Sequence, residues 1–218
     1  IVFDKKVEMM LKGNHSLFSY KDVMEYMMAQ PKYDFIYDYY IYNRKSDEIV
    51  TATIRLQAEQ FYNTMYSYQG MDFDTWYNDY LSQYHFNTYL PSRQLNAYAG
   101  TEVHQVITFI QSIPVNADRN ILGQVIILID QSIINEIIDK INWATEGFVY
   151  LIDKKGNIVA TSKDAPILPN AIEEKMTLFT DVFNYTKGEN DAVVLYDTSE
   201  KTGWKYVIVM PESAFLAE

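Results

Sequence analysis

The stretch GFVYLIDKKGNIVAT, residues 147–161, decides the fold. Its apolar first part, 147–152, predicts a β-strand, and the β-branched residues of 158–161 predict a second one. Between them Lys154–Asn157 is polar and contains a glycine, which is typical of a tight turn. We therefore expect an antiparallel hairpin here.

The chain after this hairpin continues with the same kinds of signal. Pro166 and Pro169 precede a short predicted helix at 171–179, because proline is tolerated before a helix but not inside it. Apolar segments at 192–196 and 204–210 predict strands joined by the polar turn TSEKTG. The predicted order is two strands, a helix, and two or three strands.

The chain before residue 142 predicts the same order on a larger scale. The aromatic run YDFIYDYYIYN at 33–43 has large side chains on both faces, which favours a strand covered on both sides. Residues 1–30 predict a leading helix that is interrupted at Gly13. The other elements expected before residue 142 are strands at 49–54, 103–113 and 123–129, helices at 56–68, 72–84 and 130–141, and a loop at 85–100.

These elements predict an α+β fold in which a strand–strand–helix–strand–strand unit occurs twice. The expected division is a long N-terminal leading helix at 1–30, a first module with its connecting helix at 31–141, and a second module at 142–218. Only the order of elements repeats, because the two halves share little sequence.

Five segments together resemble a known family. The hairpin at 147–161 resembles the opening hairpin of Cache domains, the extracellular PAS-like modules of bacterial receptors, and TGWKYVIVMP at 202–211 is similar to their closing strand. Upstream, YDYYIYNRKSDEIVTA at 37–52 resembles the opening hairpin of the first module in double Cache domains. ITFIQSIPV at 107–115 and GQVIILIDQSIINEII at 123–138 are similar to the end of that module and its connecting helix.

The resemblance implies a ligand-sensing ectodomain in a transmembrane receptor of Gram-positive type, such as an AraC-type transcription regulator or a two-component sensor histidine kinase. It implies that 31–141 is the membrane-distal module, that 142–218 is the membrane-proximal one, and that membrane-spanning segments flank this region in the whole receptor. A homodimer along the leading helix is compatible with that arrangement.

Composition and motifs argue against several other classes of protein. The net charge of −11 disfavours nucleic-acid binding, and the absence of cysteine excludes disulfides and thiolate chemistry. The three histidines, His15, His85 and His104, have no metal-ligand spacing, and no nucleophile elbow or phosphate-binding loop occurs. We expect no enzyme activity, no metal and no cofactor.

The aromatic residues of the first module are the main candidates for binding a small molecule. There are 19 tyrosines among 218 residues, and a tyrosine offers a flat apolar ring with one orienting hydroxyl. Packing in the core is the competing interpretation for each ring. The expected site lies between the sheet and the Trp76 helix, and its candidate residues are Tyr40, Tyr42, Trp76, Tyr77, Arg93 and Tyr98.

Three arginines are candidates for holding a ligand carboxylate: Arg55, Arg93 and Arg119. Arg93 lies in the predicted loop, and Arg119 lies in a polar turn. Double Cache modules that bind amino acids often have Arg-x-Trp-Tyr, whereas this chain has Asp74 at the position of that arginine.

Two other functions are compatible with the sequence. A contact with a partner protein predicts an exposed patch of tyrosines within 62–98. A secreted hydrolase predicts an open cleft with two facing carboxylates.

Overall fold

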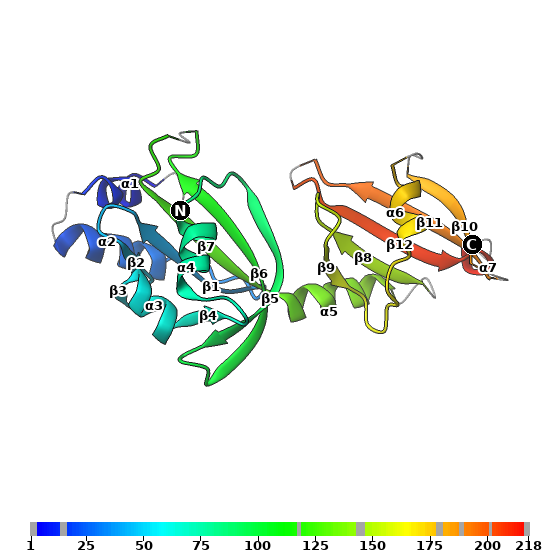
Figure 1. The fold of residues 1–218 in the computed structure, drawn as a ribbon, viewed down its shortest axis with the longest axis horizontal. Coiled ribbons are helices and arrows are strands. Elements are labelled where there is room, and N and C mark those ends of the chain that lie inside the picture. The colour runs from blue at the N-terminus through cyan, green and yellow to red at the C-terminus, as the bar shows by residue number, and fades with distance from the viewer. Residues whose placement is uncertain are drawn as a thin grey trace. The chain divides into compact units, whose positions relative to one another are not determined.

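Two antiparallel sheets organise the chain (Figure 1). The structure is a computed structural model and describes residues 4–13, 17–116, 119–142, 147–177, 181–187, 190–200 and 202–215. Contacts between residues divide the chain into two units, with the boundary after Asp130. Each unit contains one of the sheets, as the repeated order of elements predicts.

The first unit holds a seven-stranded sheet in the order β3-β2-β1-β7-β6-β5-β4. β1 pairs with β2 on one side and β7 on the other, and the long β5 and β6 form the hairpin drawn in green in Figure 1. The strands are β1 (Ile36–Asn43), β2 (Glu48–Val50), β3 (Arg55–Gln57), β4 (Tyr66–Tyr68), β5 (Thr88–Ala97), β6 (Glu102–Ile113) and β7 (Gly123–Asp130).

Side chains alternate along β1, so its two faces enter two different cores. Tyr40 and Tyr42 are buried on one face, which we call the tyrosine face, and Ile41 is buried on the opposite, aliphatic face. This confirms the prediction of a strand covered on both sides.

Helices cover both faces of this sheet. α1 (Lys5–Leu11) and α2 (Leu17–Met28) pack on the aliphatic face. α3 (Ala58–Thr64), α4 (Phe73–Trp76) and the π-helical turn η1 (Tyr77–Leu81) pack on the tyrosine face.

The leading helix is two short helices, because the chain leaves helical geometry at Gly13, whose φ is 88°. Such a positive φ favours glycine, so the expected interruption of the leading helix at this residue is confirmed. α1 and α2 pack against each other and against the sheet.

Two other predictions in the first unit need correction. The expected loop at 85–100 contains the strand β5, which pairs with β6 along most of its length. Pro91 suggested a loop, but it lies where the register shifts between Leu90 and Arg93, and a bulge tolerates a residue without an N–H. The expected helix at 56–68 is shorter, because β3 precedes α3 and β4 follows it.

The second unit holds a five-stranded sheet in the order β10-β11-β12-β8-β9. Its strands are β8 (Phe148–Ile152), β9 (Ile158–Thr161), β10 (Val182–Lys187), β11 (Asn190–Thr198) and β12 (Lys205–Pro211), and its helices are α5 (Gln131–Asn142), α6 (Asn170–Lys175) and α7 (Glu212–Phe215). The hairpin at 147–161 is therefore confirmed as β8 and β9. α6 covers the start of the helix expected at 171–179, of which 178–179 lie outside the described residues.

The connecting helix predicted at 130–141 is α5, and its contacts are with β8 and β9. The predicted first module, 31–141, includes this helix, whereas its contacts group it with the second unit. On the other face of the second sheet, Ile172 of α6 packs with Tyr150, Val194 and Val207.

Candidate ligand-binding site

Three of the six predicted ligand-binding residues lie deep in the first core. Tyr40, Tyr42 and Trp76 are at most 1% exposed and belong to one cluster on the tyrosine face. Tyr40 packs on Phe61, with ring centroids 4.8 Å apart. These side chains pack in the core beneath the sheet, as the competing interpretation of each ring predicts.

Trp76 has an unusual feature for a core residue. Its ring packs on Tyr62, with centroids 4.8 Å apart, but its buried indole N–H finds no hydrogen-bond acceptor among the residues that the structure describes. A buried donor without a partner costs about 1–3 kcal/mol. The indole N–H of Trp76 is therefore a hydrogen-bond donor that the first core does not use.

Tyr77 is joined to the first core through its hydroxyl group. Its hydroxyl lies 2.9 Å from that of Tyr42, which also donates to the Asp47 carboxylate at 3.0 Å. Burial and these two neighbours raise the pKa of Tyr42 far above its ordinary value, so its phenol stays neutral.

The candidate arginines are in three different environments. Arg55 is committed to the fold, because it donates to Glu48 at 2.7 Å and lies over the Tyr20 ring at 3.8 Å from the centroid. Arg93 is on β5 and exposed, and its charge acts on Tyr62 and Tyr80. Arg119 is exposed.

A cavity of about 690 Å³ opens beside the first half of β1. This volume lies within the range of small-molecule sites. We call it the tyrosine cavity, because its lining includes Tyr33, Tyr37, Tyr39, Tyr66 and Tyr98. Of the six predicted residues, only Tyr98 lines it, from the turn between β5 and β6.

The tyrosine cavity exists because β1 is longer than β2. β2 pairs only with Ile41–Asn43, so the first half of β1 has β7 on one side and no β2 partner on the other. After Val50 the chain turns away, and Thr51–Thr53 line the cavity. The end of α2 adds Met27 and Met28.

Asp38 is the charged centre of the tyrosine cavity. A bulge between Ile36 and Asp38 shifts the register of β1, and Asp38 then accepts the backbone N–H of Tyr39 at 2.8 Å and the hydroxyl of Tyr66 at 2.5 Å. Burial raises the pKa of the Asp38 carboxyl above its ordinary value, although the two hydrogen bonds and the charge of Lys32 act in the opposite direction.

Ring contacts join three tyrosines of the cavity, Tyr37, Tyr66 and Tyr98. The ring centroids of Tyr37 and Tyr66 are 6.0 Å apart, those of Tyr66 and Tyr98 are 6.1 Å apart, and Tyr37 lies 4.1 Å from His104. Burial and the nearby negative groups raise the pKa of Tyr37 to about 12, so this phenol is neutral at physiological pH.

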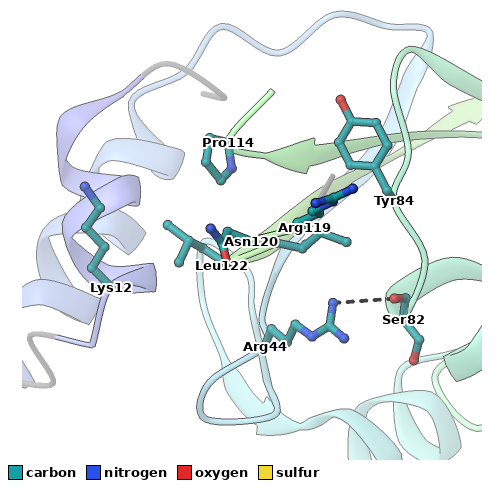
Figure 2. Close-up of a pocket in the computed structure, with 9 residues that line it drawn as sticks. Lys12, Arg44, Ser82, Tyr84, Pro114, Arg119, Asn120 and Leu122 are labelled. Carbon is teal, nitrogen blue, oxygen red and sulfur yellow. Dashed lines mark hydrogen bonds between the residues drawn. The ribbon is translucent and has the colours of Figure 1, made fainter. Parts of the chain in front are cut away.

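A second cavity, of about 830 Å³, has a different chemistry (Figure 2). Among the described residues, Lys12, Arg44 and Arg119 line it, and no acidic side chain does. All three cations are exposed, Lys12 forms an ion pair with Glu8 at 2.5 Å, and Arg44 donates to the Ser82 carbonyl at 3.5 Å. It is an open basic groove, with Tyr84 on its side.

The geometry of the described residues offers little to a metal ion. No group of three or more His, Cys, Asp or Glu within them is placed to coordinate one. His85 is buried, and its Nε2 lies 3.0 Å from the Asp79 carbonyl. His104 lies 3.3 Å from the Glu102 carboxylate, and His15 lies outside the described residues.

The family model described as the Cache domain matches residues 5–218. The chain belongs to the Cache domain family. The resemblance drawn from the hairpin at 147–161 and the closing strand at 202–211 is thereby confirmed. No curated protein matches this Cache domain.

Solved structures share the fold of this Cache domain at low identity. It is similar to the ligand-binding domain of the Pseudomonas aeruginosa amino acid chemoreceptor PctB in complex with L-Gln, at 10% identity and a TM-score of 0.59, over 96% of this chain and 81% of that one. It is also similar to the ligand-binding domain of the Pseudomonas fluorescens chemoreceptor CtaA in complex with L-alanine, at 10% identity and a TM-score of 0.57, over 97% and 86%.

Sequence reasoning missed the charged centre of the tyrosine cavity. Asp38 is the one acidic residue between Ile36 and Asn43, and that isolation within an aromatic run was the available signal. Its partner Tyr66 is on β4, at the far edge of the sheet order, so no local pattern connects the two.

Proposed function

We propose that this Cache domain is the extracellular ligand-sensing part of a bacterial transmembrane receptor, and that a small molecule binds in the tyrosine cavity. The observation that carries the proposal is the cavity itself: about 690 Å³, lined by five tyrosines and by Asp38, in the first unit. Concave sites with aromatic walls and a few polar groups are typical of small-molecule binding.

The similar structures support a sensing function. Both neighbours described above are ligand-binding domains of chemoreceptors. No described helix is long enough and apolar enough to cross a membrane. Attachment through segments outside this region therefore belongs to the proposal, as do the distal and proximal positions of the two modules.

The burial of tyrosines weighs against a protein partner as the main ligand. An interaction surface predicts exposed tyrosines within 62–98, but the structure buries Tyr62, Tyr66, Tyr68 and Tyr80. Tyr98 is exposed, and it lines the cavity.

The tyrosine cavity is placed to pass a signal to the leading helices. Met27 and Met28 of α2 line it, and the hydroxyl of Tyr39 donates to the Met27 carbonyl at 2.6 Å. A ligand in the cavity contacts the end of α2 and β1 together. It shifts the packing of α2 on the sheet only as far as its affinities for the two arrangements differ.

The predicted contacts of the ligand divide into two groups. Tyr98 lines the cavity, and Tyr40 supports it, because the Tyr40 and Tyr66 ring centroids are 6.3 Å apart. Contact of the ligand with Tyr42, Trp76, Tyr77 and Arg93 stays a prediction, and the Trp76→Phe variant tests it for Trp76.

A thermal-shift screen with a cavity-blocking variant tests the proposal. The purified domain is screened against amino acids, organic acids, sugars and amines, since a ligand at 100 times its Kd stabilises the native state by about 2.7 kcal/mol. Thr53→Trp places a large ring at the exposed rim of the cavity, and Thr64→Trp makes the same change at an exposed site on α3.

We expect a ligand that stabilises the wild type and Thr64→Trp but not Thr53→Trp. A ligand whose effect survives in Thr53→Trp places the site elsewhere. If no compound of any class raises the Tm, the small-molecule proposal is overturned.

A further inference from the structure

Asp38 places a carboxylate in the lining of the tyrosine cavity. Among the described residues, none of the ion pairs involves Asp38. Its two short hydrogen bonds come from neutral donors, the Tyr39 N–H and the Tyr66 hydroxyl. A half-buried carboxylate attracts a cation more strongly than a fully exposed one, because less solvent screens the interaction.

The surrounding rings favour the same sign of charge. The face of a tyrosine ring is electronegative and attracts ammonium groups within about 6 Å of its centroid. Tyr33, Tyr37, Tyr39, Tyr66 and Tyr98 line the same cavity as the carboxylate, and the Tyr66 hydroxyl contacts it directly. Aromatic walls around a carboxylate are suited to an organic cation, because they replace water around its apolar groups.

The charges of the lining residues point in the same direction. Asp38 and Glu102 are acidic, and Lys32 is the one basic residue of the lining. The basic groove of the same unit is the opposite, because the charged residues that the structure describes in its lining are Lys12, Arg44 and Arg119. An anionic ligand is therefore repelled by the tyrosine cavity and attracted to the basic groove.

We propose that the ligand of the tyrosine cavity is a small organic cation, whose protonated amine or quaternary ammonium group lies against the Asp38 carboxylate between the tyrosine rings. The inference rests on the proposed function, because it assigns a chemical class to the ligand of that cavity. A zwitterion fits the same site if its cationic end faces Asp38 and its anionic end faces Lys32.

The test measures affinities by isothermal titration calorimetry for choline, for putrescine and for any cation found in the screen. Choline is paired with the uncharged alcohol in which a carbon atom replaces its nitrogen, so that shape is kept and charge is lost. Asp38→Asn keeps an oxygen for the Tyr39 N–H and removes the charge. Glu59→Gln makes the same change of charge on the exposed surface of α3.

We expect a cation to bind the wild type, and its uncharged counterpart to bind about ten- to hundredfold more weakly. Asp38→Asn should lower the affinity for the cation by a similar factor, whereas Glu59→Gln changes it less than about twofold. Tyr66→Phe removes one donor to Asp38 and should weaken binding less than Asp38→Asn does. Circular dichroism and the Tm establish that each variant is folded.

Several results overturn the inference while leaving the sensor in place. If the ligands that Thr53→Trp blocks are all neutral or anionic, or if Asp38→Asn leaves the affinity for a cation within twofold, the cavity binds another class. If no compound binds, the proposed function fails together with the inference.

Discussion

In the first unit, buried tyrosine hydroxyls bond mainly to other side chains: Tyr66 to Asp38, Tyr42 to Asp47, and Tyr68 to Thr108. In the second unit, Tyr150 donates to the Pro166 carbonyl and Tyr196 to the Met176 carbonyl. A backbone carbonyl fixes a loop, whereas a side-chain partner can rotate and be replaced by a ligand group. The same order of elements therefore supports two kinds of core, one whose tyrosine hydroxyls bond mainly to side chains and one whose tyrosine hydroxyls bond to the backbone.

The cores differ in composition as well. The cluster on the tyrosine face holds six buried tyrosines and one tryptophan, whereas the second core, around Ile172, Val194 and Val207, has a single buried tyrosine, Tyr150. Both cavities described above lie in the first unit. We therefore expect changes in the second unit to alter stability without altering ligand affinity.

The largest loss of stability should come from a matched pair of glycine substitutions, one in each unit. A Cβ atom at Gly123 would lie 2.1 Å from the Tyr42 carbonyl oxygen and 2.8 Å from Leu11, and at Gly147 it would lie 2.6 Å from the Val209 oxygen. We expect Gly123→Ala to destabilise the first unit by about 3 kcal/mol or more, and Gly147→Ala to destabilise the second by about 1–3 kcal/mol.

Hydrogen exchange followed by mass spectrometry distinguishes the two glycine variants. Gly123→Ala should raise exchange in β1, β6 and β7, and Gly147→Ala in β8 and β12, the strands nearest each glycine. Loss of protection in both units from either substitution would show that the two units unfold together.

Removing the Asp153 carboxylate, which lies in the turn between β8 and β9, should cause the next largest loss of stability. The Asp153 carboxylate accepts the backbone N–H groups of Lys155 and Asn157 and the Asn157 side-chain amide, each at 2.8 Å. We expect Asp153→Ala to lower the free energy of unfolding by about 2–3 kcal/mol, because these donors lose their acceptor. Urea denaturation measures this loss.

The ligand affinity of Asp153→Ala should stay within about twofold of wild type. Asp153→Asn is the matched control, since it keeps one acceptor oxygen and should cost less stability. A large loss of affinity in Asp153→Ala would mean that the second unit contributes to binding.

The Trp76→Phe variant tests whether the unpaired indole N–H belongs to the ligand site. We expect a change of less than about 1 kcal/mol in stability, because removing an unsatisfied donor offsets the smaller ring. Affinity for the ligand of the tyrosine cavity should not change, since Trp76 does not line it. Trp76→Ala is the control, with an expected loss of about 3–5 kcal/mol. A fall in affinity in Trp76→Phe would instead support the site first predicted beneath this helix.

The smallest effect is a gain in stability from Asp38→Asn. Because burial raises the folded-state pKa of Asp38, the folded protein loses stability as the pH rises through that pKa and the carboxyl ionises. We expect Asp38→Asn to be more stable than wild type at pH 7, by about 0.5 kcal/mol for a partly exposed position. The advantage should disappear below the ordinary pKa of aspartate, where both side chains are neutral.

Thermal denaturation of both proteins between pH 3 and pH 7 measures this difference, with Glu59→Gln as the control for the loss of one negative charge. A variant that loses both ligand affinity and stability at neutral pH would show that Asp38 serves the fold. Gain of stability with loss of affinity is the pattern of a functional residue that is costly to the fold.

The sequence by itself determined the α+β class, the hairpin at 147–161, the long strands at 103–113 and 123–129, and the break at Gly13. These features depend on turn residues and on side-chain alternation within a few residues, and such local preferences are visible in one sequence. The sequence also determined that the first half of the chain is rich in tyrosine.

The tertiary structure alone decided the strand at 88–97 and the tyrosine cavity. β5 is a strand because β6 supplies its hydrogen-bond partners, whereas Pro91 suggested a loop. The cavity brings together Asp38 of β1, Tyr66 of β4 and Tyr98 of the β5–β6 turn. Contacts between residues so far apart in the chain depend on how the sheet is assembled, and no local spacing encodes them.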